Sequence, residues 1–195
     1  MIALIDYSAG NTASVANVLK ELKADFILTN DKNEIETADK IILPGVGEAS
    51  SAMKRLNELR LVSIVKSCKQ PFLGICLGMQ LLCERTEEGD ADCLGIIPAV
   101  VKKFDQHNLK VPHMGWNQIK YYNKDNLFTS VDDNSYFYFA HSYFVPQNNY
   151  ATSVCDYGIN FSASVRYNNF YGVQFHPEKS AQQGIQIIKN FLELC

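Results

Sequence analysis

The sequence lacks an apolar run long enough to cross a membrane. A spanning helix needs about 20 consecutive, mostly apolar residues, and no segment of this 195-residue chain approaches that length. Residues 1–6 also lack the basic start, the longer apolar core and the small-residue cleavage site of a signal peptide. We therefore expect a cytoplasmic protein without a membrane partner, and a first strand at residues 2–6.

An excess of charge of one sign is also missing. The net charge is −3 and the isoelectric point is near 5.8, which gives no electrostatic reason to expect nucleic acid as a partner. The chain lacks internal repeats, low-complexity tracts and a linker. With 195 residues it can build one sizeable core, so we expect a single domain over residues 1–195.

The cysteines lack the spacing of a metal site. None of the six belongs to a Cys-x-x-Cys pair, and no Cys and His spacing suits zinc, so we expect no metal and no cofactor. In a cytoplasmic chain of this length they are expected to be free thiols, most of them small core residues. They are Cys68, Cys76, Cys83, Cys93, Cys155 and Cys195.

The first half of the chain alternates strands and helices. Strands are expected at residues 2–6, 25–28, 40–43 and 72–75. Apolar residues at helical spacing follow residue 11, run from 49 to 69 with a break near 59–61, and continue from 77 to 85. Strands separated by helices predict a central, mostly parallel sheet that is flanked by helices.

The second half is richer in Val, Tyr and Phe. It predicts additional, partly antiparallel strands at residues 136–140, 150–155, 161–165 and 171–175. A last helix begins near Ala181, and its apolar face carries Ile185, Ile188, Phe191 and Leu192. The predicted fold class is therefore α/β, with a mostly parallel sheet between helices and extra antiparallel strands in the second half.

The segment Gly74-Ile75-Cys76-Leu77-Gly78 places a cysteine where a strand becomes a helix. A sharp turn there pushes the side chain out of the sheet edge, as in a nucleophile elbow, and the two glycines remove side chains that would crowd it. The helix N-terminus and a nearby histidine would both favour the thiolate. Taken alone, the segment is equally consistent with a core cysteine between glycines that pack a strand against a helix.

His176 and Glu178 follow the expected strand 171–175. Pro177 biases His176 toward extended backbone, in which residues i and i+2 point the same way, so Glu178 can orient the ring. The other ring nitrogen is then free for Cys76, because parallel strands end at the same sheet edge. A plain loop or a helix start also explains His-Pro-Glu. Three other histidines are available on spacing grounds: His107, His113 and His141.

The loop Pro44-Gly45-Val46-Gly47 follows another expected strand and reaches the same edge. Attack on an amide carbonyl creates an oxyanion, which needs prepositioned N–H donors. The glycines allow an N–H to turn toward a ligand, and the amide of Leu77, directly after the cysteine, is a natural second donor. A plain strand-to-helix connection explains the four loop residues equally well.

Together these segments resemble the class I (triad-type) glutamine amidotransferases. Within that family they are similar to the glutaminase subunits of imidazole glycerol phosphate synthase, an enzyme of histidine biosynthesis. The matching segments span nearly the whole chain, and the resemblance implies the family's flavodoxin-like α/β fold. They are Asp6-Tyr7, Gly10-Asn11, Ser14-Val15, Pro44-Gly45-Val46-Gly47, Gly74 to Gln80, Val111 to Asn117, His141-Ser142-Tyr143 and Gln174 to Ser180.

The resemblance also implies a mechanism. Cys76 attacks the side-chain carboxamide of L-glutamine, and His176 protonates the departing ammonia. His176 then activates the water that hydrolyses the glutamyl thioester, while Glu178 orients His176. The implied oxyanion donors are the amides of Val46, Gly47 and Leu77. The implied substrate contacts are Gln80, Glu88, Ser142 and Tyr143. Glu88 also fits a solvated acid in the charged stretch 84–92.

The resemblance implies a partner that consumes the ammonia. The family's glutaminases form heterodimers with a (β/α)8-barrel cyclase, which makes imidazole glycerol phosphate and an aminoimidazole carboxamide ribotide with ammonia passed through the barrel. By resemblance the interface residues are His113, Trp116, Asn117, Tyr138 and Lys179. Large amphipathic Trp and Tyr side chains suit protein contacts. Core packing is the other explanation, above all for Tyr138 in the alternating run 136–139.

Two alternative functions stay open. A paralogous amidotransferase subunit would use the same chemistry to feed ammonia to a surface-sugar-modifying synthase. A catalytically inactive scaffold would only bind a partner, although the complete Cys, His and Glu set argues against it.

Overall fold

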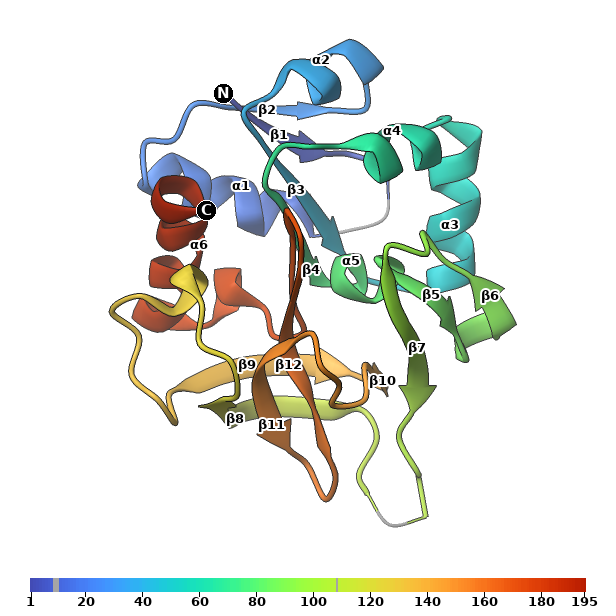
Figure 1. Cartoon of the computed structure of the whole chain (residues 1–195), viewed down its shortest axis with the longest axis vertical. Helices are drawn as coiled ribbons and strands as arrows, with labels where there is room; N and C mark the ends of the chain where they lie inside the picture. The colour runs from blue at the N-terminus through green and yellow to red at the C-terminus, as the bar shows by residue number, and fades with distance from the viewer. Residues whose placement is uncertain (9–10, 108) are drawn as a thin grey trace.

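A nine-stranded sheet forms the centre of the molecule, with helices on both faces of one half (Figure 1). The structure is a computed structural model that describes residues 1–8, 11–107 and 109–195. Gly10 of the matching segment Gly10-Asn11 therefore lies outside the described residues. The strand order is β2-β1-β3-β4-β13-β12-β11-β8-β9.

The parallel half of the sheet contains the strands that lead to the predicted site. β2 (Phe26–Thr29), β1 (Ile2–Ile5), β3 (Lys40–Gly45), β4 (Phe72–Cys76) and β13 (Phe170–Val173) all run parallel. Pro44 pairs with Ile75 and Gly45 with Cys76, so the Pro-Gly loop and the cysteine leave the sheet side by side. The predicted parallel strands are confirmed in this half, and the sheet as a whole is mixed.

The other half is antiparallel, as the second half of the sequence predicts. β12 (Asn160–Tyr167), β11 (Ala151–Asp156), β8 (His113–Tyr121) and β9 (Tyr136–His141) continue the sheet to its far edge. The sequence patterns did not predict β8, although three of its residues were expected at an interface. Exposure alternates along the strand, but His113 lies on its buried side while Met114 and Trp116 are exposed, so the sequence lacks the apolar-in, polar-out pattern of a half-buried strand.

A second, four-stranded sheet stands beside the first. Its order is β10 (Tyr143–Phe144), β7 (Ile97–Lys103), β5 (Cys83–Thr86) and β6 (Ala91–Asp92). The predicted helix over residues 77–85 is therefore wrong beyond Leu81, where α5 (Leu77–Leu81) ends. The backbone carbonyls that would continue the helix bind a distant segment instead: Leu81 O accepts from Leu94 N, and Leu82 O from Ile97 N.

Helices cover both faces of the parallel strands (Figure 1). α1 (Thr12–Glu21) and α6 (Ala181–Leu194) cover one face, and their apolar residues pack on alternate residues such as Ile2 and Leu4. α2 (Lys32–Thr37), α3 (Ala49–Glu58), α4 (Val62–Ser67) and α5 cover the other face, against Ala3 and Ile5. The predicted break near 59–61 is confirmed between α3 and α4. None of the helices in the described ranges has the length and apolar character needed to span a membrane.

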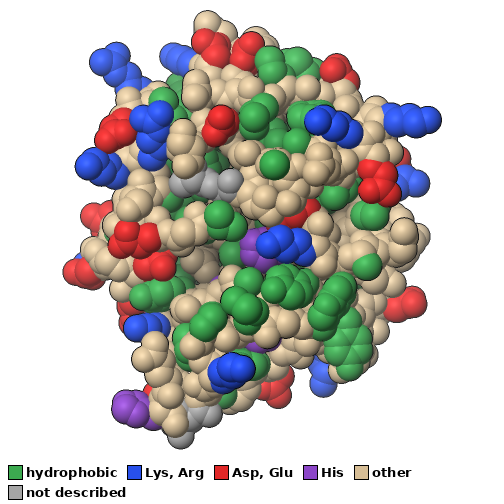
Figure 2. Space-filling view, turned by 180° about the vertical axis from the view of Figure 1, so that it is seen from behind, with side chains coloured by type: hydrophobic (Ala, Val, Ile, Leu, Met, Phe, Trp, Pro, Cys, Tyr) green, Lys and Arg blue, Asp and Glu red, His purple; other side chains and the backbone are tan. Residues whose placement is uncertain are grey.

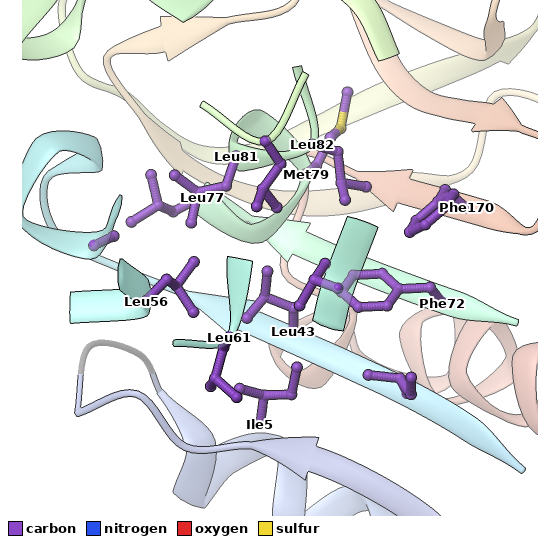
Figure 3. Packing of buried hydrophobic residues seen from close by; sticks show 14 of the residues in the cluster. Ile5, Leu43, Leu56, Leu61, Phe72, Leu77, Met79, Leu81, Leu82 and Phe170 are labelled. Atoms are coloured by element: carbon purple, nitrogen blue, oxygen red, sulfur yellow. The ribbon is translucent and has the colours of Figure 1, made fainter. Parts of the chain in front are cut away.

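The core places α5 firmly on the sheet. Figure 3 shows Leu77, Met79, Leu81 and Leu82 packed above Leu43 and Phe72. Among the residues that the structure describes, the remaining helical segments are the 3₁₀ turns η1 (Glu88–Asp90), η2 (Asn126–Phe128) and η3 (Pro177–Lys179). Because α5 begins directly after β4, this packing determines where the last residue of β4, Cys76, stands.

Candidate active site

A pocket of about 210 Å³ opens where the parallel strands β3 and β4 end. Its lining brings together the predicted nucleophile, the predicted oxyanion residues and all four predicted substrate contacts. These are Cys76, Val46, Gly47, Leu77, Gln80, Glu88, Ser142 and Tyr143. Four further lining residues had no assigned role at this pocket: Pro112, Met114, Ala140 and His141.

Cys76 occupies a strained turn between β4 and α5. Its backbone angles are φ 53° and ψ −109°, an unfavourable combination for a residue with a side chain. A Cβ added to Gly74 would lie 2.6 Å from the carbonyl O of Gly78. A Cβ added to Gly78 would lie 2.0 Å from the carbonyl O of Leu43. The expected need for glycine on both sides of the turn is confirmed. With only five residues, α5 offers the thiol little helix dipole.

His176 and Glu178 form a buried ion pair behind the pocket. Nδ1 of His176 lies 2.9 Å from Oε1 of Glu178, and the two side chains are 3% and 1% exposed. The expected backbone differs in one respect, because Glu178 lies in the 3₁₀ turn η3 and not in extended chain. The turn still directs the carboxylate to the ring, which leaves Nε2 of His176 for another partner.

The thiol of Cys76 is the other group that acts on the His176 ring. Burial by itself lowers the pKa of His176, but hydrogen bonds to Cys76 and Glu178 and the negative charges of both outweigh burial and raise the pKa to about 10. The protonated ring is therefore favoured at neutral pH. A cationic imidazole against a sulfur atom is the arrangement that makes cysteine a nucleophile.

Gln174 also approaches the sulfur atom. Its Nε2 lies 3.6 Å from Sγ of Cys76, and its Oε1 accepts a hydrogen bond of 2.9 Å from Nε2 of Gln80. Gln80 donates a second bond, of 2.8 Å, to the carbonyl O of Tyr143. The sequence contained a signal for Gln174, because residues two apart near a strand end point the same way, and His176 is two residues later.

Glu88 is held by the helix on the other side of the pocket. Its Oε2 accepts a hydrogen bond of 2.8 Å from the backbone N of Ala49, the first residue of α3. Burial raises the pKa of this half-buried carboxyl group. The structure therefore does not place Glu88 as a fully solvated acid, and it lies where a cationic group of a ligand in the pocket would be attracted.

The predicted interface residues range from exposed to buried. Trp116 on β8 lies opposite Tyr138 on β9, with ring centroids 6.2 Å apart, and Nζ of Lys179 is 5.9 Å from the Tyr138 ring centre. Asn117 is half-buried. His113, in contrast, is 3% exposed, as its core-packing alternative expects. Figure 2 shows a face of the molecule on which hydrophobic side chains gather beside histidine and cationic side chains.

Of the other histidines only His141 lines the pocket, and the remaining cysteines lie outside its lining. His107 is exposed, and His113 and His141 are hydrogen-bonded to each other. All six cysteines are unpaired, and four are buried: Cys68, Cys76, Cys83 and Cys155. In the ranges that the structure describes, no group of three or more His, Cys, Asp or Glu side chains is arranged to hold a metal ion.

Comparison with known proteins agrees with this geometry. The family model for class I glutamine amidotransferases matches residues 3–195. The imidazole glycerol phosphate synthase subunit HisH of Bacteroides fragilis is 49% identical over 99% of both chains. The corresponding subunit HisH 2 of Legionella pneumophila is 47% identical over 100% of this chain and 98% of its own.

Solved structures show the same fold at lower sequence identity. One glutamine amidotransferase superposes with a TM-score of 0.77 and 17% identity, covering 100% of this chain and 98% of the other. A glutamine amidotransferase from Thermotoga maritima superposes with a TM-score of 0.64 and 19% identity, covering 98% and 82%. The chain therefore belongs to the class I glutamine amidotransferase family and, within it, to the HisH subunits of imidazole glycerol phosphate synthase.

Proposed function

We propose that the chain hydrolyses L-glutamine to glutamate and ammonia, with Cys76 as nucleophile, His176 as general acid and base, and Glu178 as the group that orients His176. The observation that carries this proposal is the buried His176–Glu178 pair against a strained cysteine that lines a pocket. The high identity to HisH subunits over the full length supports glutamine as the substrate.

The two half-reactions use the same histidine. The Cys76 thiolate forms a bond to the carboxamide carbon of glutamine, and the protonated His176 gives its proton to the leaving nitrogen, which departs as ammonia. His176, now neutral, takes a proton from water, whose oxygen attacks the thioester. Glutamate leaves and the thiolate returns. The backbone amides of Val46, Gly47 and Leu77 are suited to the oxyanion because all three residues line the pocket beside Cys76.

The rest of the pocket fits the amino acid end of glutamine. Glu88 supplies a carboxylate for the α-ammonium group, and Gln80 with the backbone of Ser142 and Tyr143 supplies polar atoms on the opposite wall. These roles follow from the positions of the side chains in the pocket lining. Substitution of Glu88 by Gln should therefore raise the KM for glutamine more than it lowers kcat.

We also propose how the chain works in its surroundings. It acts as one domain over residues 1–195, in the cytoplasm, as a heterodimer with a (β/α)8-barrel cyclase that receives the ammonia and makes imidazole glycerol phosphate. The exposed Trp116 and Lys179 and the half-buried Tyr138 are the interface candidates that the geometry favours. His113 is more suited to a role inside the chain.

The nucleophile is tested with the complex of this chain and its cyclase. The Cys76→Ala substitution should abolish synthesis with glutamine as nitrogen source, because no thioester can form, and leave synthesis with added ammonia unchanged. Rates are measured as formation of imidazole glycerol phosphate. Cys195→Ala, a substitution at a thiol outside the pocket, is the matched control and should retain both activities.

Either of two results would contradict the proposed function. Full glutamine use by Cys76→Ala would remove the nucleophile assignment. Failure of the unsubstituted chain to react at Cys76 with a glutamine-analogue electrophile such as diazo-oxo-norleucine, even with the cyclase present, would indicate an inactive scaffold.

A further inference from the structure

Two buried histidines beside the pocket take no part in the proposed mechanism. Nδ1 of His113 lies 3.0 Å from Nε2 of His141, and Nδ1 of His141 lies 2.7 Å from the carbonyl O of Tyr143. The two residues are 3% and 6% exposed. Because buried polar groups need hydrogen-bond partners, their surroundings determine which ring nitrogen of each carries a proton.

The donor and acceptor of each of these hydrogen bonds can be assigned by starting at the carbonyl O of Tyr143. A carbonyl oxygen only accepts, so Nδ1 of His141 must carry the hydrogen that Tyr143 receives. In a neutral ring the other nitrogen is then an acceptor, and Nδ1 of His113 must donate to it. Nε2 of His113 is left as an acceptor, and Nδ2 of Asn117 lies 3.3 Å away.

The amide of Asn117 is oriented independently. Its Nδ2 donates to the carbonyl O of Asp156 at 3.0 Å, and its Oδ1 accepts from the backbone N of Gln118 at 2.8 Å. Both bonds require nitrogen and oxygen in the observed positions. The series Asn117, His113, His141 and Tyr143 O, which we call the histidine relay, therefore has one consistent direction with both rings neutral.

The relay meets the active site at the carbonyl of Tyr143. That oxygen accepts a second bond from Nε2 of Gln80, which fixes the orientation of the Gln80 amide. Nε2 of Gln80 also donates to Oε1 of Gln174, so that Gln174 must turn its own Nε2 toward Sγ of Cys76. Each amide in this series can be reversed only if its neighbour loses a bond.

We propose that Gln174 is a further active-site residue, whose amide N–H donates a hydrogen bond to the Cys76 thiolate. His113 and His141 are the positioning residues that hold this donor in place, acting as neutral rings with hydrogen on Nδ1. Their effect passes through the Tyr143 carbonyl and the Gln80 amide. This inference rests on the proposed function of Cys76 and extends it to the residues that prepare the thiolate.

The surroundings of the relay favour neutral rings. His113 stacks between Phe139 and Tyr157, with ring centroids 4.8 and 4.0 Å away. Burial lowers the pKa of His113 to about 4. Burial, together with the neighbouring rings of His113 and His176, lowers the pKa of His141 to about 3, against the opposing effect of the bond to Tyr143.

The relay is tested first by the nitrogen NMR spectrum of the full chain, labelled with ¹⁵N in histidine. Both relay rings should carry hydrogen on Nδ1 at neutral pH, the less common tautomer of free histidine, while Nε2 of each shows no attached hydrogen. Assignment uses His107→Gln, a substitution at the exposed histidine outside the relay. A hydrogen on Nε2 of His141 would overturn the relay, whatever the activity of the chain.

The donor role of Gln174 is tested by alkylation of Cys76. With iodoacetamide near neutral pH, and with the Cys76 peptide quantified by mass spectrometry, Gln174→Met should react about tenfold more slowly, because the thiolate loses a charge-assisted hydrogen bond. Gln174→Glu, which keeps the acceptor for Gln80, should be slowed as well. Gln182→Glu, on the exposed surface of α6, is the control and should react as the unsubstituted chain does.

The outcomes separate this inference from the proposed function. If folded Gln174→Met is alkylated at the unsubstituted rate, the role of Gln174 is contradicted, while the assignment of Cys76 as nucleophile is unaffected. His141→Asn, whose amide nitrogen can replace Nδ1 toward Tyr143, should retain alkylation better than His141→Phe, and equal rates would remove the relay's influence. If Gln174→Met does not fold, the alkylation profile of Gln174→Glu against pH decides: a profile that does not move to higher pH would contradict the donor role.

Discussion

The hydroxyl group of Tyr7 is buried beside the active site and has no hydrogen-bond partner among the described residues. An added Cβ on Gly45 would lie 2.9 Å from it, so it stands under the predicted oxyanion loop. Burial, with a smaller effect of Cys76, raises the pKa of Tyr7, and the hydroxyl stays neutral. An unpaired buried polar group costs about 1–3 kcal/mol.

Removal of this hydroxyl should therefore be harmless to stability. We expect Tyr7→Phe to keep or raise the free energy of unfolding, by up to about 1 kcal/mol, in urea denaturation. Tyr121→Phe is the matched control, because that hydroxyl donates to the carbonyl of Val131 and its loss should lower stability by about 1 kcal/mol. A Tyr7→Phe chain less stable than Tyr121→Phe would mean that the Tyr7 hydroxyl has a partner in solution.

The relay histidines predict how stability depends on pH. In the folded chain the pKa of His113 is about 4 and that of His141 about 3, below their ordinary value of 6.5. At pH values between the folded pKa values and the ordinary value, the unfolded chain binds more protons than the folded chain. The stability that the neutral rings provide is present above pH 6.5 and is lost as the pH falls toward the folded pKa values, by about 1.4 kcal/mol per pH unit for each ring.

This dependence is measured as the free energy of unfolding between about pH 7 and about pH 5. In His113→Gln, the slope of the free energy of unfolding against pH should lose roughly half of the contribution of His113 and His141, because only one ring with a lowered pKa remains. His107→Gln, at the exposed ring, should keep the full slope. Equal slopes for all three chains would show that the relay rings are protonated in the folded state.

At the scale of elements, the nucleophile depends on how closely α5 approaches β3. A Cβ added at Gly78 by substitution to alanine would lie 2.0 Å from the carbonyl oxygen of Leu43, a residue of β3. Because the neighbouring atom belongs to the backbone, it cannot move aside as the end of a flexible side chain can. Gly78→Ala should therefore lower the free energy of unfolding by about 3 kcal/mol and displace Cys76. Ser67→Ala at the end of α4 should cost far less, and denaturation of both chains compares them. Equal losses would contradict the close approach.

The same elements separate what local patterns predict from what they miss. β1, β3 and β4 were predictable because each is a short, continuous apolar run, and α1 because its apolar residues recur at helical spacing. β5 was misread as the end of a helix. Its conformation is decided by pairing with β7, more than ten residues away in the sequence, and local propensity is weaker than such tertiary hydrogen bonds.

At the scale of the whole molecule, one face of the β8–β9 pair is unusually apolar. Trp116 is 53% and Met114 65% exposed, and they lie opposite Tyr138 and Ala140 in the register. Large exposed side chains in a contiguous group are typical of protein interfaces. The backbone of His176 is hydrogen-bonded to the strand that carries this face, because its N donates to the carbonyl O of Tyr138 at 2.9 Å.

Trp116 should therefore contribute strongly to binding of the cyclase. We expect Trp116→Ala to weaken the complex by about 2 kcal/mol, roughly 30-fold in Kd, in titration calorimetry with the cyclase. Leu28→Ala is the control, since Leu28 is 47% exposed on β2, at the opposite edge of the sheet. The same affinity for both chains would move the interface away from the β8–β9 face.

The sequence by itself determined the fold class and the family, and it supplied the residues that are proposed as the reacting groups. A strand followed by Gly-x-Cys-x-Gly, and a strand followed by His-Pro-Glu, are local patterns whose meaning follows from parallel strands that end at one edge. Their distances and protonation were decided only in the tertiary structure, because burial and charge come from residues far apart in sequence. The roles proposed for Gln174, His113 and His141 arise at that level, where a series of hydrogen bonds joins separate segments of the chain to one sulfur atom and one carbonyl.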